Sequence, residues 1–184
     1  MDRFRIAEIR LIVQPDSDDP GAAEVLVSGS IAGVEYLFLL DTGAARSCVL
    51  SDEYTATFSP AGHTSSWGVF GPSSDDLITV PSLALGSIVR RDFMLARVRQ
   101  SGPGMRNLVG MDLLKDYCCR FLFSENRLLL SAACEPGEGH ALEVALLDLL
   151  LDRSSHPYVS VWLGEARANA VWDSGAGVSV ADTS

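Results

Sequence analysis

Residues 38–50 read FLLDTGAARSCVL, and residues 170–180 read AVWDSGAGVSV. Each stretch is a short apolar run that ends in one aspartate, Asp41 or Asp173, followed by a small hydroxyl residue and a glycine. The apolar run predicts a buried strand that fixes where the carboxylate emerges, and the glycine permits a turn that another backbone can approach closely. Two such units in one chain suggest that two carboxylates meet in one site.

Two carboxylates that share a site cannot both ionise easily, so one pKa rises and the pair holds a single proton. The ionised member can then take a proton from water while the protonated member polarises a carbonyl group. We therefore expect Asp41 and Asp173 to act as an acid–base pair that needs no cofactor and no metal. The hydroxyls of Thr42 and Ser174 can both donate to and accept from a neighbouring loop.

The same order of elements precedes both aspartates. An apolar run, a polar loop, a strand and a glycine turn lead into Asp41 through residues 4–13, 14–21, 24–30 and Gly33, and into Asp173 through residues 142–151, 152–156, 158–163 and Gly164. Periodicity alone would allow residues 142–151 to be a helix, but an internal duplication favours a strand. We expect a first lobe over residues 1–134, a linker EPGEGH over 135–140, and the beginning of a second, truncated lobe over 141–184.

Short alternating segments separated by turn residues predict an all-β fold. Two strands flank a turn at Ala32 and Gly33, two more are joined at Gly86, and residues 119–132 read as a hairpin with its turn at 124–126. The best helix candidate is short and opens after Gly110 within residues 107–117.

Composition excludes several classes of function. The 184 residues carry a net charge of −10, which argues against binding to nucleic acid or to an anionic membrane surface. No apolar segment is long enough for a bilayer, and no signal peptide is visible at the N-terminus. We expect four reduced, half-buried cysteines in a cytoplasmic protein, with a disulfide framework as the second reading. The three histidines lack metal-ligand spacing, so no metal site is expected.

The segment LLDTGAARSCVL resembles the active-site loop of retropepsin-like aspartic proteases. Two further marks of that family are a hydrophobic-hydrophobic-Gly segment before a short helix, here Leu108, Val109 and Gly110, and a flap hairpin between the two motifs. The resemblance covers roughly residues 4–131, and a weaker resemblance begins at residue 141. It implies a closed β-barrel lobe with one short helix.

The resemblance also implies roles for individual residues. Asp41 and Asp173 would be catalytic, and they would be supported by Thr42, Gly43, Ser174 and Gly175. The flap would hold an extended peptide as an added β-strand at Trp67, Gly68, Val69, Phe70 and Gly71.

The function implied is an aspartic endopeptidase that acts on an extended polypeptide. Its dyad would join Asp41 to Asp173 in a two-lobed protein, of which this chain would be a fragment, or would join two copies of Asp41 in a homodimer. The alternative is a non-catalytic peptide-binding or dimerisation module that keeps the fold.

Overall fold

The computed structural model describes residues 7–17, 19–68, 71–99, 102, 104–132, 144–148, 155–177 and 179–180. These residues form thirteen strands, two 3-10 turns and one four-residue helix, so the expectation of a mainly β protein is confirmed. The elements are β1 (Ala7–Pro15), β2 (Ala23–Ile31), β3 (Val34–Leu40), β4 (Cys48–Leu50), η1 (Thr55–Thr57), β5 (Pro60–Gly68), β6 (Gly71–Leu85), β7 (Ile88–Val98), β8 (Asn107–Val109), α1 (Met111–Leu114), β9 (Cys118–Leu122), η2 (Phe123–Glu125), β10 (Arg127–Ser131), β11 (Val144–Asp148), β12 (Ser155–Leu163) and β13 (Ala166–Val171).

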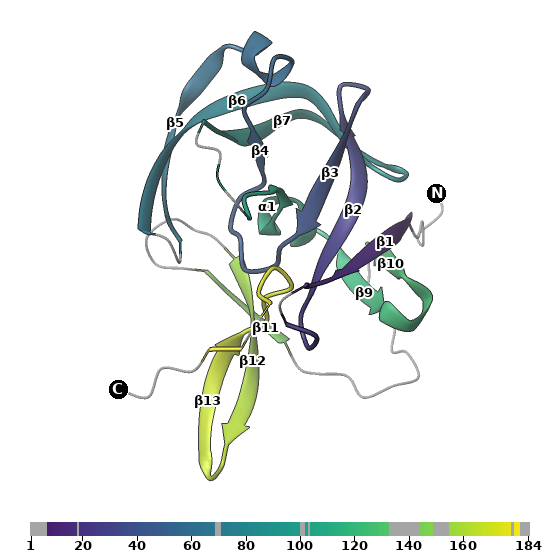
Figure 1. Cartoon of the computed structure of the whole chain (residues 1–184), viewed down its shortest axis with the longest axis vertical. Helices are drawn as coiled ribbons and strands as arrows, with labels where there is room; N and C mark the ends of the chain where they lie inside the picture. Colours follow the sequence, from purple (N-terminus) through teal and green to yellow (C-terminus); the bar gives the residue numbers. More distant parts are fainter. Residues whose placement is uncertain are drawn as a thin grey trace.

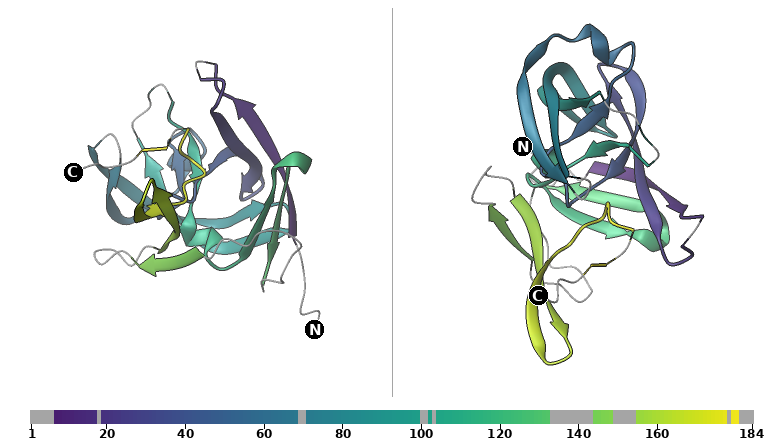
Figure 2. Two further views of the ribbon diagram at one scale, coloured as in Figure 1. Left: turned by 90° about the horizontal axis from the view of Figure 1, so that it is seen from below. Right: turned by 60° about the vertical axis from the view of Figure 1, so that its left-hand side comes forward.

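Two sheets account for all of these strands (Figure 1). The larger has ten strands in the order β5-β6-β7-β4-β8-β3-β2-β1-β10-β9, and β6 also pairs with β2. The smaller has the order β11-β12-β13 and projects away from the larger sheet in the right-hand view of Figure 2. In each sheet an antiparallel three-strand run, β1-β2-β3 or β11-β12-β13, leads directly to one of the two aspartates.

Alternation of side chains builds the core of the larger sheet. In β1, Ala7, Ile9 and Leu11 are buried while their neighbours Glu8 and Arg10 are exposed. The core also contains fully buried side chains from β2, β3, β6, β7, α1 and β10, among them Ile31, Phe38, Leu40, Ile78, Leu83, Leu95, Leu113 and Leu128. This burial is what removes apolar surface from water and holds the strand that ends at Asp41 in place.

The turns lie where the sequence predicts them. Ala32 and Gly33 join β2 to β3 with φ values of 46° and 89°, the positive pair that a two-residue hairpin turn requires. Gly86 joins β6 to β7, and Asn126, with φ of 51°, closes the hairpin of β9 and β10. The strand expected within residues 142–151 is present as β11.

Strand β8 decides the position of the candidate site. It lies between β3 and β4, parallel to β3 and antiparallel to β4. The loop that joins β3 to β4, residues 41–47, must therefore cross the end of β8, where α1 begins (Figure 1). The short helix opens after Gly110, as expected.

The cysteines correct one expectation. Cys48 and Cys119 are free, but Cys118 is disulfide-bonded, so the expectation that all four cysteines are reduced is wrong. Neighbouring residues on a strand point to opposite faces, and Cys119 packs against the core. Within the described residues, no helix has the length and apolarity needed to cross a bilayer.

Candidate functional site

The loop after β3 and the loop after β13 bind each other through two reciprocal hydrogen bonds. The backbone N–H of Thr42 donates to Ser174 Oγ over 3.1 Å, and the backbone N–H of Ser174 donates to Thr42 Oγ1 over 2.9 Å. In Figure 1 the segment that follows β13 rises to meet the loop at the end of β3. The two D-[TS]-G units, far apart in the sequence, are therefore in direct contact.

Each hydroxyl also donates across the junction. Thr42 Oγ1 donates to the carbonyl oxygen of Trp172 over 2.5 Å, and Ser174 Oγ donates to that of Leu40 over 2.7 Å. Four hydrogen bonds thus relate the two loops by approximate two-fold symmetry within one chain. Thr42 is only 3% exposed, so water is a poor substitute for these partners.

The glycines leave the space that the two carboxyl groups occupy. A Cβ atom at Gly43 would lie 2.3 Å from Cγ of Asp173, and one at Gly175 would lie 2.5 Å from Cγ of Asp41. Both contacts are far closer than van der Waals distance. Each carboxyl group is therefore seated over the glycine of the opposite loop, and the motif needs glycine for close approach rather than for an unusual φ.

The two carboxyl groups have different surroundings. Asp41 is half-buried, and its pKa is raised to about 6, first by burial and then by the neighbouring Asp173, which acts as a charge and as a hydrogen-bond partner. The backbone amides of Gly43 and Ala44 oppose the shift, because they donate to the ionised form. Oδ1 of Asp41 is buried and has no hydrogen-bond partner among the described residues. Asp173 is exposed, and its Oδ1 accepts from the backbone N–H of Gly175 over 2.8 Å.

The hydrophobic-hydrophobic-Gly segment supports the first loop from beneath. The N–H of Asp41 donates to the carbonyl oxygen of Val109, and the N–H of Met111 donates to that of Ala44. A Cβ atom at Gly110 would lie 2.7 Å from the same Ala44 oxygen, so only glycine allows this approach. Leu108, Val109 and Gly110 therefore fix the loop rather than contribute chemical groups.

An aromatic contact adds to the junction between the two sheets. The ring of Trp172, immediately before Asp173, packs edge-on against Phe121 of β9 with a centroid separation of 4.9 Å. Pairs of this geometry stabilise by about 0.5–1.5 kcal/mol beyond the area that they bury. Trp172 also donates its backbone N–H to the carbonyl oxygen of Pro157 in β12, which ties the second loop to its own sheet.

The segment expected to be a flap is a β-hairpin at the edge of the larger sheet. Strands β5 and β6 pair as far as Gly68 and Gly71, with Trp67 opposite Pro72. Val69 and Phe70 lie outside the described residues, and so does the side chain of Trp67. The assignment of Trp67, Gly68, Val69, Phe70 and Gly71 to peptide binding therefore stays a prediction.

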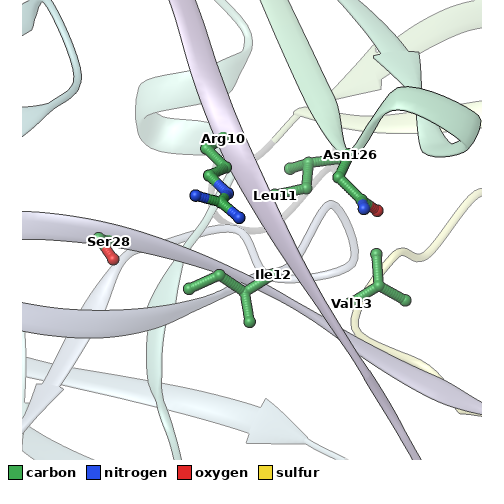
Figure 3. Close-up of a pocket in the computed structure, with 6 residues that line it drawn as sticks. All are labelled: Arg10, Leu11, Ile12, Val13, Ser28 and Asn126. Carbon is green, nitrogen blue, oxygen red and sulfur yellow. The ribbon is translucent and has the colours of Figure 1, made fainter.

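A separate pocket lies where β1 passes from one neighbouring strand to the other (Figure 3). It is lined by Arg10, Leu11, Ile12, Val13, Ser28 and Asn126, none of which belongs to the two loops. The charged group in this lining is the exposed guanidinium of Arg10, and the lining includes no acidic or basic side chain to act with it. The pocket therefore has no evident catalytic chemistry. In the part of the chain that the structure describes, no group of three or more His, Cys, Asp or Glu side chains is arranged to hold a metal ion.

Two features of the site could not be read from the sequence. Ser47 and Asp112 form a buried hydrogen-bonded pair beneath the first loop, and Phe121 contacts Trp172 across the two sheets. An aspartate in the first turn of a short helix ordinarily indicates helix capping, and a phenylalanine on a strand ordinarily indicates packing. Neither residue carried a signal of contact with the site.

Comparisons with known proteins show likeness to solved structures and to nothing else that was compared. No protein-family model matches the sequence, and no curated protein matches it. Among solved structures, the chain is similar to the crystal structure of a retropepsin-like aspartic protease from Rickettsia conorii. The TM-score is 0.47 and the sequence identity 17%, over 70% of this chain and 93% of that one.

Proposed function

We propose that this chain is an aspartic endopeptidase whose acid–base pair is Asp41 and Asp173. The observation that carries the proposal is the set of reciprocal hydrogen bonds between Thr42 and Ser174, because it brings the two carboxyl groups face to face over Gly43 and Gly175. A module that only bound peptides would have no need of two carboxyl groups held so close that Asp173 raises the pKa of Asp41.

The pair would hold one proton, and Asp41 is the member that retains it, because its pKa is raised to about 6. Asp173, as the ionised member, takes a proton from water, and the water oxygen attacks the carbonyl carbon of a peptide bond. Asp41 meanwhile gives its proton to the carbonyl oxygen, and a tetrahedral diol forms. Collapse of the diol breaks the C–N bond: Asp173 protonates the leaving nitrogen, and the diol returns a proton to Asp41.

The same contacts favour a pair within one chain over a pair made by two copies of Asp41. Asp173 already fills the space above Gly43. The Thr42 hydroxyl already donates to the carbonyl oxygen of Trp172 and accepts from the N–H of Ser174. A second copy would have to displace these groups before its own loop could dock. An extended polypeptide remains the proposed substrate, held against the hairpin of β5 and β6.

Cleavage of an unfolded protein or a peptide library, measured against pH, tests this proposal. Asp41→Asn and Asp173→Asn should each abolish cleavage while the far-UV circular dichroism stays that of the wild type. The matched control is Asp116→Asn, which changes an exposed aspartate away from the two loops. Cleavage that needs Asp41 but survives Asp173→Asn would indicate a homodimer instead. Wild-type protein that binds peptides but cleaves none at any pH would support the binding module.

A further inference from the structure

A third carboxyl group lies beneath the first loop, and the proposed chemistry does not use it. Asp112 is in the first turn of α1 and is largely buried, and this burial raises its pKa. Its Oδ1 accepts from the backbone N–H of Ser47 over 2.9 Å and from Ser47 Oγ over 2.6 Å. Its Oδ2 accepts from the same N–H over 2.9 Å. One carboxylate thus holds both donors of a single serine.

Ser47 connects the Asp112 carboxylate to Gly110, next to the candidate site. It is fully buried, and its Oγ accepts from the backbone N–H of Gly110 over 3.0 Å. Gly110 in turn packs against the carbonyl groups of Ala44 and Arg46 so closely that no Cβ would fit. The residue before Gly110, Val109, accepts from the N–H of Asp41. An unbroken series of short contacts therefore runs from the Asp112 carboxylate to the backbone of Asp41.

We propose that Asp112 is a positioning residue for Asp41: by holding Ser47 and, through it, Gly110, it sets the direction in which the loop 41–47 presents the Asp41 carboxyl group to Asp173. This inference rests on the proposed function for its catalytic meaning. The geometric part, that Asp112 fixes the surroundings of Asp41, stands without it.

Burial and the neighbouring Asp173 raise the pKa of Asp41, and the amides of Gly43 and Ala44 oppose the shift. The ionisable groups near Asp112 itself are Arg46, which favours its ionised form, and the buried thiol of Cys48. Ser47→Ala leaves every charge in place, so a change in the titration of Asp41 in that variant reports a change in the position or burial of Asp41.

Asp112→Asn is the first variant, because it keeps the size of the side chain but replaces one acceptor oxygen with a donor that faces the Ser47 N–H. In cleavage assays below the melting temperature, we expect kcat to fall about 10- to 100-fold with KM nearly unchanged, the pattern of a misplaced reacting group. Asp116→Asn, four residues further on and exposed, is the matched control and should leave both constants unchanged.

Ser47→Ala is the second variant, for the case that Asp112→Asn does not fold. It keeps the N–H donor to Asp112 and removes only the two hydrogen bonds of the hydroxyl. We expect the same fall in kcat, and the double variant should be no worse than the more impaired single variant, because both act through one connection.

An NMR titration of the aspartate side-chain carboxyl carbons separates this inference from the proposed function. The resonance of Asp41, assigned by its loss in Asp41→Asn, should titrate near 6 in the wild type and nearer the ordinary range of aspartate in Asp112→Asn and Ser47→Ala. Folded variants with wild-type kcat and an unshifted Asp41 titration would overturn the positioning role. A shifted titration in a protein that cleaves nothing would retain the geometric role and reject the endopeptidase.

Discussion

At the scale of single residues, Gly43 and Gly175 are the positions where one added methyl group would collide with the carboxyl group of the opposite loop. A Cβ atom at Gly43 would lie 2.3 Å from the Asp173 carboxyl carbon, so Gly43→Ala must push that carboxyl group away from Asp41. We expect cleavage to fall by about 100-fold or more, since displacement of a reacting group by roughly 1 Å has effects of this size. Steady-state kinetics on a peptide substrate would measure it.

The control for Gly43→Ala is Gly62→Ala in β5. The nearest atom to a Cβ there is the end of the Leu77 side chain at 3.9 Å, an ordinary contact. Gly62→Ala should leave kcat unchanged. If the two alanine variants behaved alike, the close seating of the carboxyl groups over the glycines would have no catalytic importance.

The raised pKa of Asp41 predicts how activity depends on pH. The acid–base pair works only while it holds one proton, so activity should decline as the pH rises above about 6. A plot of log kcat/KM against pH should show this descending limb. A rate that stays constant from about pH 6 to 8 would contradict the assignment of the proton to Asp41.

The same shift predicts a dependence of folding stability on pH. Because the pKa of Asp41 is higher in the folded than in the unfolded chain, the folded state binds more protons between about pH 4 and 6. The free energy of unfolding contributed by Asp41 must therefore fall as the pH rises through this window. Denaturant titrations should show a flatter profile for Asp41→Asn, which should be at least as stable as the wild type at pH 7.

At the scale of secondary-structure elements, Arg97 of β7 joins three parts of the larger sheet. Its guanidinium donates to Asp76 of β6 over 2.8 Å and to the carbonyl oxygens of Thr55 and Phe58, at and just after η1. Arg97 and Asp76 are both buried. The pair ties η1 to the base of the β5–β6 hairpin, where His63 of β5 also contacts Asp76.

Arg97→Gln should lower the denaturant midpoint clearly more than Arg99→Gln. Both arginines contact the same Asp76 oxygen, but the Arg99 side chain is 70% exposed and that of Arg97 only 6%. Arg97→Gln takes from Asp76 its buried partner and from the carbonyl oxygens of Thr55 and Phe58 their guanidinium donor, whereas the exposed Arg99 contributes little. Equal midpoints for the two variants would show that burial of Arg97 has no influence on the strength of this contact.

Individual elements were largely predictable from the sequence, because alternation and turn residues are local signals. The turn at Ala32 and Gly33, the hairpin closed at Asn126 and the helix after Gly110 all occur where expected. The insertion of β8 between β3 and β4 was not predictable. It joins segments about 60–70 residues apart, parallel to β3 and antiparallel to β4, and a single sequence holds no local signal for such distant pairing.

At the scale of the whole molecule, the junction between the two sheets depends on a few buried hydrogen bonds. Thr42→Val removes the donor to Trp172 and the acceptor for Ser174, and it leaves two backbone groups without partners. We expect a loss of about 1–3 kcal/mol in the free energy of unfolding. Thr42→Ser keeps the hydroxyl and is the matched control.

Chemical denaturation followed by Trp172 fluorescence, in proteins that carry Trp67→Phe and Trp162→Phe, would follow this junction directly. Separate transitions for Trp172 and for the far-UV circular dichroism of Thr42→Val would show that the sheets come apart before the larger one unfolds. A Thr42→Val curve that overlays that of the wild type would contradict the importance of the threonine hydroxyl.

The candidate site was predictable only in part. Asp41 and Asp173 could be paired from the repeated motif, because the chemistry of two carboxylates requires a partner for each. Asp112 and Phe121 could not be found, since each has an ordinary local role and reaches the site only through residues distant in the sequence. The contacts that position a reacting group are thus harder to read than the group itself.

The hydrogen bonds between Thr42 and Ser174 also set an order of events during biosynthesis. The ribosome releases Asp41 long before Asp173, at about 5–20 residues per second, and domains fold as they emerge. The larger sheet can form while the segment after β13 is still being made, but the carboxyl pair cannot exist until that segment is free to reach Gly43. A nascent chain that has not yet released this segment therefore carries Asp41 without the second carboxyl group beside it.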